Sequence, residues 1–387
     1  MGALRLVGVR EDAAALALRG VAVAQLGEDR AAQKLLRRAE RGLSPGDPMR
    51  ARVLAARGEV ALAARDLGLA GRLLETAEAA LAGDRVNRTF VRLLRVRLSL
   101  LLGRVEDARG LVAIDVRGAP PRLRAHAELL RADIAARRLR VLEAEAAIAR
   151  ARTAARAAAL PPLSAQVERV AADIAAPVAR LVCDRRSALA TLADVASLAR
   201  EPALVIDACR HELRLRGGAV SLATRPVLFA LAQALGEAAP LAQGRALLIE
   251  RAFGARRTTD SLRARLRVEI GRLRRALAPL GTAIDSTLEG YALRGGRVFV
   301  VLPPGDGEAS LLLALLRSGE AWSSSALASA SGLGKRAVQR ALAGLKHAGK
   351  IDSHGAGRNL RWVARPPDGF ATTLLLATRP TRAKPRS

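Results

Sequence analysis

The sequence predicts a mainly α-helical chain, in which a long helical array is followed by two smaller segments that combine helices with short strands. Residues 11–200 are rich in Ala, Leu and Arg, with apolar residues at i, i+3 and i+4, the spacing typical of helices. Short strand-like runs begin only after Pro202. Half of the 387 residues are hydrophobic, which is enough for a sizeable core and argues against a largely disordered chain.

The charge balance favours a polyanionic partner. The chain has 64 Lys and Arg against 36 Asp and Glu, a formal net charge of +28. Such an excess is typical of proteins that bind nucleic acid or an anionic membrane surface. The Arg- and Ala-rich composition is also typical of a GC-rich genome, so the position of the charge is more informative than its total.

Residues 1–200 are expected to form one helical repeat domain. Loop-like breaks fall near 42–48, 81–85, 117–121 and 160–162. Small residues recur at intervals of 36–38: Gly20 and Gly58, and then Ala32, Ala70, Ala108 and Ala144. This pattern resembles the tetratricopeptide repeat over about 12–160 in four units, with a fifth, degenerate helix pair to about 200. The resemblance implies stacked helix pairs whose concave surface receives a protein or peptide partner. A plain helical bundle is the alternative.

The segment 203–302 is expected to form a second domain. Strands are predicted at 203–208, 211–215 and 219–222. Three helices follow, at 225–236 with Thr224 as N-cap, at 244–254 ending on Gly254, and at 260–277 with Asp260 as N-cap. Residues 282–301 are predicted to form a β-hairpin.

The third of these helices has the pattern of a DNA-recognition helix. Its apolar residues form one stripe, made of Leu262, Leu266, Ile270, Leu273 and Leu277. Guanidinium groups, which pair bidentately with phosphates and with guanine, lie outside this stripe. They are Arg263, Arg265, Arg267, Arg272, Arg274 and Arg275.

The sequences VEIGRLRRAL (268–277) and IDSTLEGYAL (284–293) resemble the winged-helix output domain of two-component response regulators, and more closely the version in the Streptomyces antibiotic regulatory proteins. Gly290 and Tyr291 stand at that family's Gly-Tyr position. The resemblance implies that the third helix enters a DNA major groove, with Arg272 and Arg274 toward DNA. The chain departs from the family at Glu269, at Gly271, and at the wing tip 287–289, which carries Thr-Leu-Glu instead of a cation or proline.

Residues 308–366 are expected to form a second winged helix-turn-helix domain, which resembles generic bacterial winged helices. A helix at 309–320 precedes a helix-turn-helix at 323–351 that turns at Gly332, with Val338, Leu342 and Leu345 facing inward. The first turns of its second helix, which in such folds contact bases, carry Lys335, Arg336, Gln339 and Arg340. A wing at 350–366 carries Arg358 and Arg361, and Trp362 is expected to pack on the sheet instead of on DNA. Residues 367–387 are a basic tail.

The sequence offers no pattern for catalysis or for a cofactor. Cys183 and Cys209 suit neither a disulfide framework nor a metal site, and His126 is interpreted as a solvated or packed side chain. The segment GLGK (332–335) lacks the rest of a phosphate-binding loop. We find no signal peptide and no apolar run of about 18 residues, so we expect a cytoplasmic, nucleoid-associated protein that is not an enzyme and needs neither metal nor cofactor.

Most of the net charge outside the array lies with the two predicted recognition helices. Residues 251–280 carry a net +7 and residues 331–387 a net +10. This placement favours a bacterial transcriptional regulator that binds double-stranded DNA sequence-specifically and senses a partner through its repeats. The alternatives are a protein-interaction adaptor that uses winged helices for docking and a non-specific architectural DNA binder. Dimerisation is left open.

Overall fold

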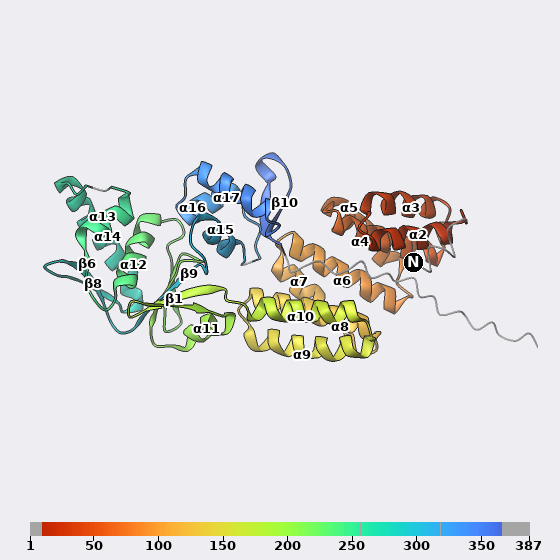
Figure 1. The fold of residues 1–387 in the computed structure, drawn as a ribbon, viewed down its shortest axis with the longest axis horizontal. Helices are drawn as coiled ribbons and strands as arrows, with labels where there is room; N and C mark the ends of the chain where they lie inside the picture. Colours follow the sequence, from red (N-terminus) through yellow and green to blue (C-terminus); the bar gives the residue numbers. More distant parts are fainter. Residues whose placement is uncertain (1–9, 256, 318, 366–387) are drawn as a thin grey trace, which may run out of the picture. The chain divides into compact units, whose positions relative to one another are not determined.

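The computed structural model describes residues 10–365 apart from 256 and 318. The chain is mainly helical (Figure 1) and divides into two compact units, which are described separately. The first contains residues 10–134 and 143–170, and the second contains 135–142 and 171–365, with the two gaps just named. The basic tail predicted at 367–387 lies outside the described residues.

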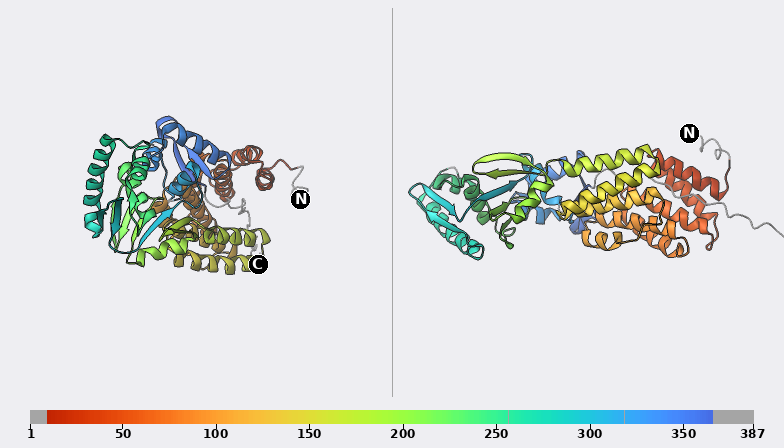
Figure 2. Two further views of the ribbon diagram at one scale, coloured as in Figure 1. Left: turned by 60° about the vertical axis from the view of Figure 1, so that its left-hand side comes forward. Right: turned by 90° about the horizontal axis from the view of Figure 1, so that it is seen from below.

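Nine consecutive helices follow from residue 13 to residue 175 (red to yellow-green in Figure 2). They are α2 (Ala13–Gln25), α3 (Asp29–Arg41), α4 (Pro48–Ala63), α5 (Leu67–Ala80), α6 (Arg85–Leu101), α7 (Val105–Val112), α8 (Pro121–Arg137), α9 (Val141–Ala158) and α10 (Pro161–Ala175). The four predicted breaks all fall between helices. Aspartates begin several of them, because a carboxylate accepts hydrogen bonds from the free amides of a first turn: Asp47 accepts from Met49, Asp66 from Leu69 and Asp84 from Asn87.

Small residues let neighbouring helices approach closely at regular intervals. A Cβ atom at Gly20 of α2 would lie 2.8 Å from Cγ of Leu36 in α3, and one at Gly58 of α4 would lie 2.7 Å from Cδ2 of Leu74 in α5. The predicted alanines, Ala32, Ala70, Ala108 and Ala144, are all fully buried. The 38-residue spacing in the sequence therefore coincides with a repeated contact between a glycine and a leucine 16 positions later.

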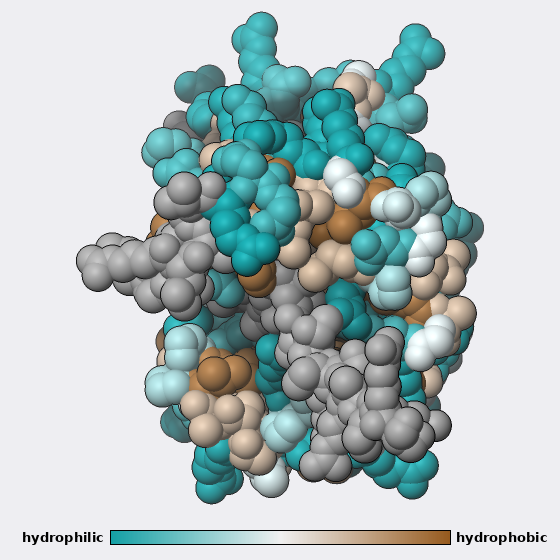
Figure 3. Space-filling model, turned by 90° about the vertical axis from the view of Figure 1, so that its right-hand side faces the viewer, coloured by the Kyte–Doolittle hydropathy of each residue, from teal (hydrophilic) through white to brown (hydrophobic). Residues whose placement is uncertain are grey.

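The face drawn in Figure 3 is mainly hydrophilic, with its apolar side chains in small separate groups.

The expected fifth helix pair is wrong. After α10, β1 (Ala179–Cys183) and β2 (Arg186–Ala190) form an antiparallel hairpin, and only the short helix α11 (Leu192–Ser197) follows. The hairpin forms because β1 also pairs with β9 (Val298–Leu302), so that Leu181 lies opposite Val301. A partner strand more than a hundred residues away thus stabilises an extended conformation here.

The strands of residues 179–302 form two sheets. One has six strands in the order β2-β1-β9-β3-β4-β5, in which β3 (Leu204–Asp207) runs parallel to β9 and β4 (Glu212–Leu215) and β5 (Gly218–Ser221) continue antiparallel. The three predicted strands after Pro202 are therefore confirmed. The predicted hairpin at 282–301 is confirmed for β7 (Ala283–Ser286) and β8 (Gly290–Arg294). Its last residues instead form β9 in the six-stranded sheet.

Three helices pack with these sheets around one core. They are α12 (Pro226–Ala238), α13 (Arg245–Phe253) and α14 (Asp260–Leu277). A Cβ at Gly236 would lie 2.5 Å from Ile206 of β3, so the absence of a side chain lets α12 lie close to the sheet. Two predicted N-caps are wrong by one residue: Arg225 instead of Thr224 precedes α12, and Thr259 instead of Asp260 caps α14, its hydroxyl accepting from the Leu262 amide. Gly254 ends α13 in the left-handed conformation, as predicted.

The last described segment has its own small core. It contains α15 (Glu308–Leu316), α16 (Ser324–Ser331), α17 (Lys335–His347) and a two-stranded sheet of β10 (Ile351–His354) and β11 (Arg361–Ala364). A single turn of 3-10 helix lies in this segment at Gly357–Asn359, and two others lie earlier in the chain, at Leu198–Arg200 and Ala278–Leu280. The predicted helix-turn-helix boundaries agree with α16 and α17, because Ser323 caps α16 and Gly332 turns with a φ of +70°.

Candidate nucleic-acid interface

Helix α14 is attached to the core by one face, as its sequence predicts. Leu266, Ile270, Leu273 and Leu277 are buried, and Leu262 packs against the same cluster while partly exposed. Because one apolar stripe carries all of this packing, the opposite face of the helix is left to charged side chains.

All six predicted arginines of this helix are exposed at the surface, but their contacts differ. Arg263 pairs with Asp260 at 3.4 Å, and Arg272 pairs with Glu269 at 2.8 Å. The Arg265 guanidinium lies 4.5 Å from the centre of the Phe253 ring of α13. Arg267 and Arg275 have no side-chain partner among the described residues. The exposed pairs stabilise the fold little, so these cations can exchange protein contacts for phosphates.

Arg274 contacts the hairpin β7–β8 instead of facing solvent alone. Its guanidinium donates to the carbonyl of Ile284 at 2.9 Å and to the hydroxyl of Ser286 at 3.0 Å. Arg245, at the start of α13, donates to the carbonyls of Thr287 and Leu288 at 2.8 and 2.7 Å. Both guanidiniums also lie over the buried Tyr291 ring, at 6.0 and 5.6 Å. We call Arg245, Arg274 and Tyr291 the wing brace.

Sequence reasoning missed Arg245 and the contacts that make up the wing brace. Arg245 belongs to a helix that carried no functional expectation, and its partners lie 42 and 43 residues further along the chain. The predicted hairpin at 282–301 and the resemblance at Gly290 and Tyr291 pointed toward this region, but not toward Arg245. Gly290 is required because a Cβ there would overlap the carbonyl oxygen of Gln243 in the neighbouring strand β6 (Gln243–Gly244).

The tip of this hairpin is apolar and acidic. Leu288 is 100% exposed, which is unusual for a leucine, and Glu289 follows it. Val268 on the outer face of α14 is 55% exposed. The tip residues 287–289 therefore carry no cation of their own, and the guanidinium that contacts them is that of Arg245.

In the last segment, α17 presents a basic first turn. Val338, Leu342 and Leu345 are buried, as predicted, while Lys335, Arg336, Gln339 and Arg340 are exposed. Arg340 pairs with Glu308 of α15 at 3.1 Å. In the segment GLGK (332–335), Gly332 ends α16 and Gly334 is the N-cap of α17.

The hairpin β10–β11 carries the two remaining predicted arginines. Arg358 is exposed, while Arg361 donates to the carbonyls of Arg358 and Leu360 and so helps to close the loop. Trp362 packs against the core and donates to the Ser324 hydroxyl at 2.9 Å, which confirms the expectation that it faces the fold.

Other chemical groups lie apart from these surfaces. His126 is buried, and burial together with Arg97 and Arg122 lowers its pKa to about 4. Cys183 and Cys209 are free thiols. Within residues 10–365, apart from 256 and 318, no group of three metal-ligating side chains is found, and no helix is both long and apolar enough to cross a membrane.

Comparison with known proteins found no match: no family model, no curated protein and no solved structure is similar to this chain.

Proposed function

We propose that this protein is a transcriptional regulator that binds double-stranded DNA. The observation that carries the proposal is α14, a helix with a largely buried apolar stripe and six exposed arginines beside a braced β-hairpin. Arginine suits this task because its planar guanidinium pairs with phosphates and with the edge of guanine.

The winged-helix interpretation of residues 203–302 is supported by element order and strand pairing. Three strands precede α12, and α13 and α14 are followed by β7 and β8. The short β6, between α12 and α13, pairs with β8 and so joins the hairpin to the helices. In such a fold the third helix enters a major groove and the hairpin contacts the adjacent backbone or minor groove.

A second DNA contact is proposed at α17. Its exposed first turn carries Lys335, Arg336 and Gln339, in the position from which recognition helices contact bases. Two such modules on one chain could reach successive major grooves, which lie about 34–36 Å apart.

The helical array is proposed to bind a protein or peptide partner. The repeated approach of Gly20 to Leu36 and of Gly58 to Leu74 supports a tetratricopeptide-like repeat, since helix pairs of one geometry stack into an extended surface. Binding of this partner to the array would be the signal that changes the DNA affinity of the two modules.

The test is a fluorescence anisotropy titration with duplex DNA at several salt concentrations. We expect tight binding at about 50 mM salt that weakens steeply as salt rises, because phosphate contacts release counterions. The variant R263A/R267A should bind more weakly, and its salt slope should be smaller by about 1.8 if both groups contact phosphates. The charge-matched control is R30A/R37A, which removes two exposed arginines of α3. Absence of duplex binding at low salt, or equal losses in both variants, would contradict the proposal.

A docking role for the middle domain is the second candidate, favoured by Leu288 at the hairpin tip and by Val268. An exposed leucine at a tip without a cation suits a protein surface better than a phosphate backbone. This function would be selected if the chain binds no duplex DNA and if the substitution L288S abolishes capture of a partner in a pull-down experiment.

Affinity that is equal for all duplex sequences would instead indicate an architectural DNA binder.

A further inference from the structure

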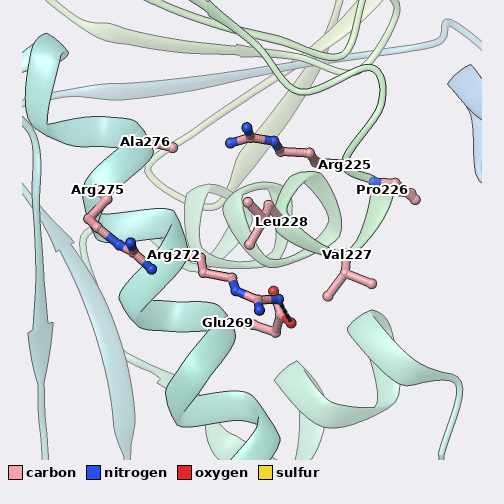
Figure 4. Close-up of a pocket in the computed structure, with 8 residues that line it drawn as sticks. All are labelled: Arg225, Pro226, Val227, Leu228, Glu269, Arg272, Arg275 and Ala276. Atoms are coloured by element: carbon pink, nitrogen blue, oxygen red, sulfur yellow. Dashed lines mark hydrogen bonds and ion pairs between the residues drawn. The ribbon is translucent and has the colours of Figure 1, made fainter.

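A hollow of about 590 Å³ lies between the start of α12 and the C-terminal half of α14 (Figure 4). Its size falls within the range of small-molecule sites, about 300–1,000 Å³. The residues that line it are Arg225, Pro226, Val227, Leu228, Glu269, Arg272, Arg275 and Ala276. All of them belong to the middle domain.

The hollow carries an excess of positive charge. In Figure 4, Arg225 reaches in from the α12 side, while Arg272 and Arg275 reach in from α14. Glu269 neutralises Arg272, with 2.8 Å between the paired atoms. Arg225 and Arg275 have no side-chain partner in the described part of the chain, so two guanidinium charges remain uncompensated around one space.

The same hollow has an apolar component. Val227, Leu228 and Ala276 contribute to its lining, and Leu228 is buried beneath it. An inorganic anion would use the guanidiniums but not this apolar surface. A ligand that satisfies both parts carries phosphate groups at one end and, at the other, a flat heterocycle whose faces can pack on apolar side chains.

We propose that this hollow binds a nucleotide, with its phosphates on Arg225 and Arg275 and its base against the apolar side chains. Arginine is suited to the phosphates, since its fork makes two parallel hydrogen bonds to one anion. The GLGK segment (332–335) does not line this hollow.

The proposal has a regulatory consequence that rests on the proposed DNA-binding function. Arg272 and Arg275 belong to the helix proposed to contact DNA, so a bound nucleotide would neutralise charge that the duplex also needs. Nucleotide and DNA should therefore oppose each other, and by linkage each should weaken the other by the same factor.

The first experiment is isothermal titration calorimetry of the full chain with ATP and, separately, with inorganic triphosphate. We expect saturable binding of one ATP per chain, and weaker binding of triphosphate because it lacks a base.

The substitution R225Q should weaken ATP binding about tenfold or more, since a charge-assisted hydrogen bond to phosphate is lost. The matched control R200Q, which alters an exposed arginine outside the hollow, should bind ATP like the original chain. Thermal unfolding of R225Q should be unchanged, because Arg225 is exposed.

The second experiment measures duplex affinity with and without ATP. We expect ATP to weaken DNA binding by the original chain, while R225Q binds DNA normally and no longer responds to ATP. Three results would overturn the proposal: no saturable ATP binding, equal ATP binding by R225Q and the original chain, or triphosphate binding as tightly as ATP. If R225Q loses as much affinity for DNA as for ATP, the hollow is a contact for the DNA backbone and the proposal also fails. A chain that binds ATP at Arg225 but no DNA would refute the proposed function and leave the nucleotide site standing.

Discussion

At the residue scale, Arg274 differs from its neighbours on α14. The sequence placed it among the DNA-facing arginines, but in the structure it is hydrogen-bonded to the β7–β8 hairpin. Arg267, two turns away on the same helix, has no such contact among the described residues. One residue type on one helix thus has two different environments, and only the fold distinguishes them.

We therefore predict that R274A loosens the hairpin. Loss of the hydrogen bonds to Ile284 and Ser286 should increase amide exchange across 284–293, because those groups lose a charged partner. The measurement is hydrogen exchange read by mass spectrometry. R267A serves as the control and should leave the hairpin unchanged. Equal protection of the hairpin in the two variants would contradict the brace.

We predict that His211 makes the free energy of unfolding dependent on pH. It lies buried in the second unit with its ring stacked on Phe229 at 4.3 Å, and burial lowers its pKa from 6.5 to about 4. Between those pH values the unfolded chain binds a proton that the folded chain does not. The free energy of unfolding should therefore fall as the pH falls from about 7 to 4.

The variant H211N isolates this contribution. Urea unfolding of both chains at pH 7, 5.5 and 4.5 should show H211N less stable at pH 7, because the ring contact is lost, and the difference should shrink as the pH falls. Asparagine also tolerates the positive φ of 52° at this position. A difference that stays constant with pH would mean that His211 does not titrate in this range.

At the scale of elements, helical glycines differ in whether the surrounding structure leaves room for a side chain. Gly58 lies where a Cβ would be 2.7 Å from Leu74, which is fully buried and has little room to move. Gly271 lies in α14 with nothing within 4 Å of such a Cβ. Both positions are glycine in the sequence, and only the packing around each one decides what an added methyl group does.

We predict that G58A destabilises the chain by about 1–3 kcal/mol through overpacking, whereas G271A stabilises it by about 0.5–1 kcal/mol through helix propensity. Both substitutions add one methyl group inside a helix, so each is the control for the other. Thermal and urea unfolding measure the effects. A stabilising G58A would show that α4 and α5 do not approach as closely as described.

The hairpin β1–β2 shows why one element escaped prediction. Its two-residue turn, Asp184 and Arg185, has φ values of 50° and 63°, a geometry for which Gly or Asn is the usual signal. Neither residue appears there, so the run looked helical like the array before it. Pairing with β9 is non-local and leaves no local pattern in residues 179–183.

At the scale of the whole molecule, the distribution of charge bears on how many modules contact DNA. The sequence segments 251–280 and 331–387, with net charges of +7 and +10, include α14 and α17. If both helices bind the same duplex, their contributions to the salt dependence should add, since each phosphate contact releases its own counterion.

The double variant K335A/R336A tests this addition. Both side chains are exposed on the first turn of α17. The salt slope of duplex binding should fall by about 1.8 relative to the original chain, and combining these changes with R263A/R267A should lower it by about twice that amount. An unchanged slope in K335A/R336A would restrict DNA contact to the middle domain.

The sequence by itself determined the features that depend on neighbouring residues. Helices follow from apolar stripes such as that of α14, turns follow from glycines such as Gly254 and Gly332, and the excess of positive charge follows from composition. Only the tertiary structure decided the position of β9 outside its expected hairpin, the brace of Arg245 and Arg274, and the hollow around Arg225. The physical reason is distance along the chain: Arg245 and Leu288 are 43 residues apart, and no local period encodes which distant side chains meet when a core closes.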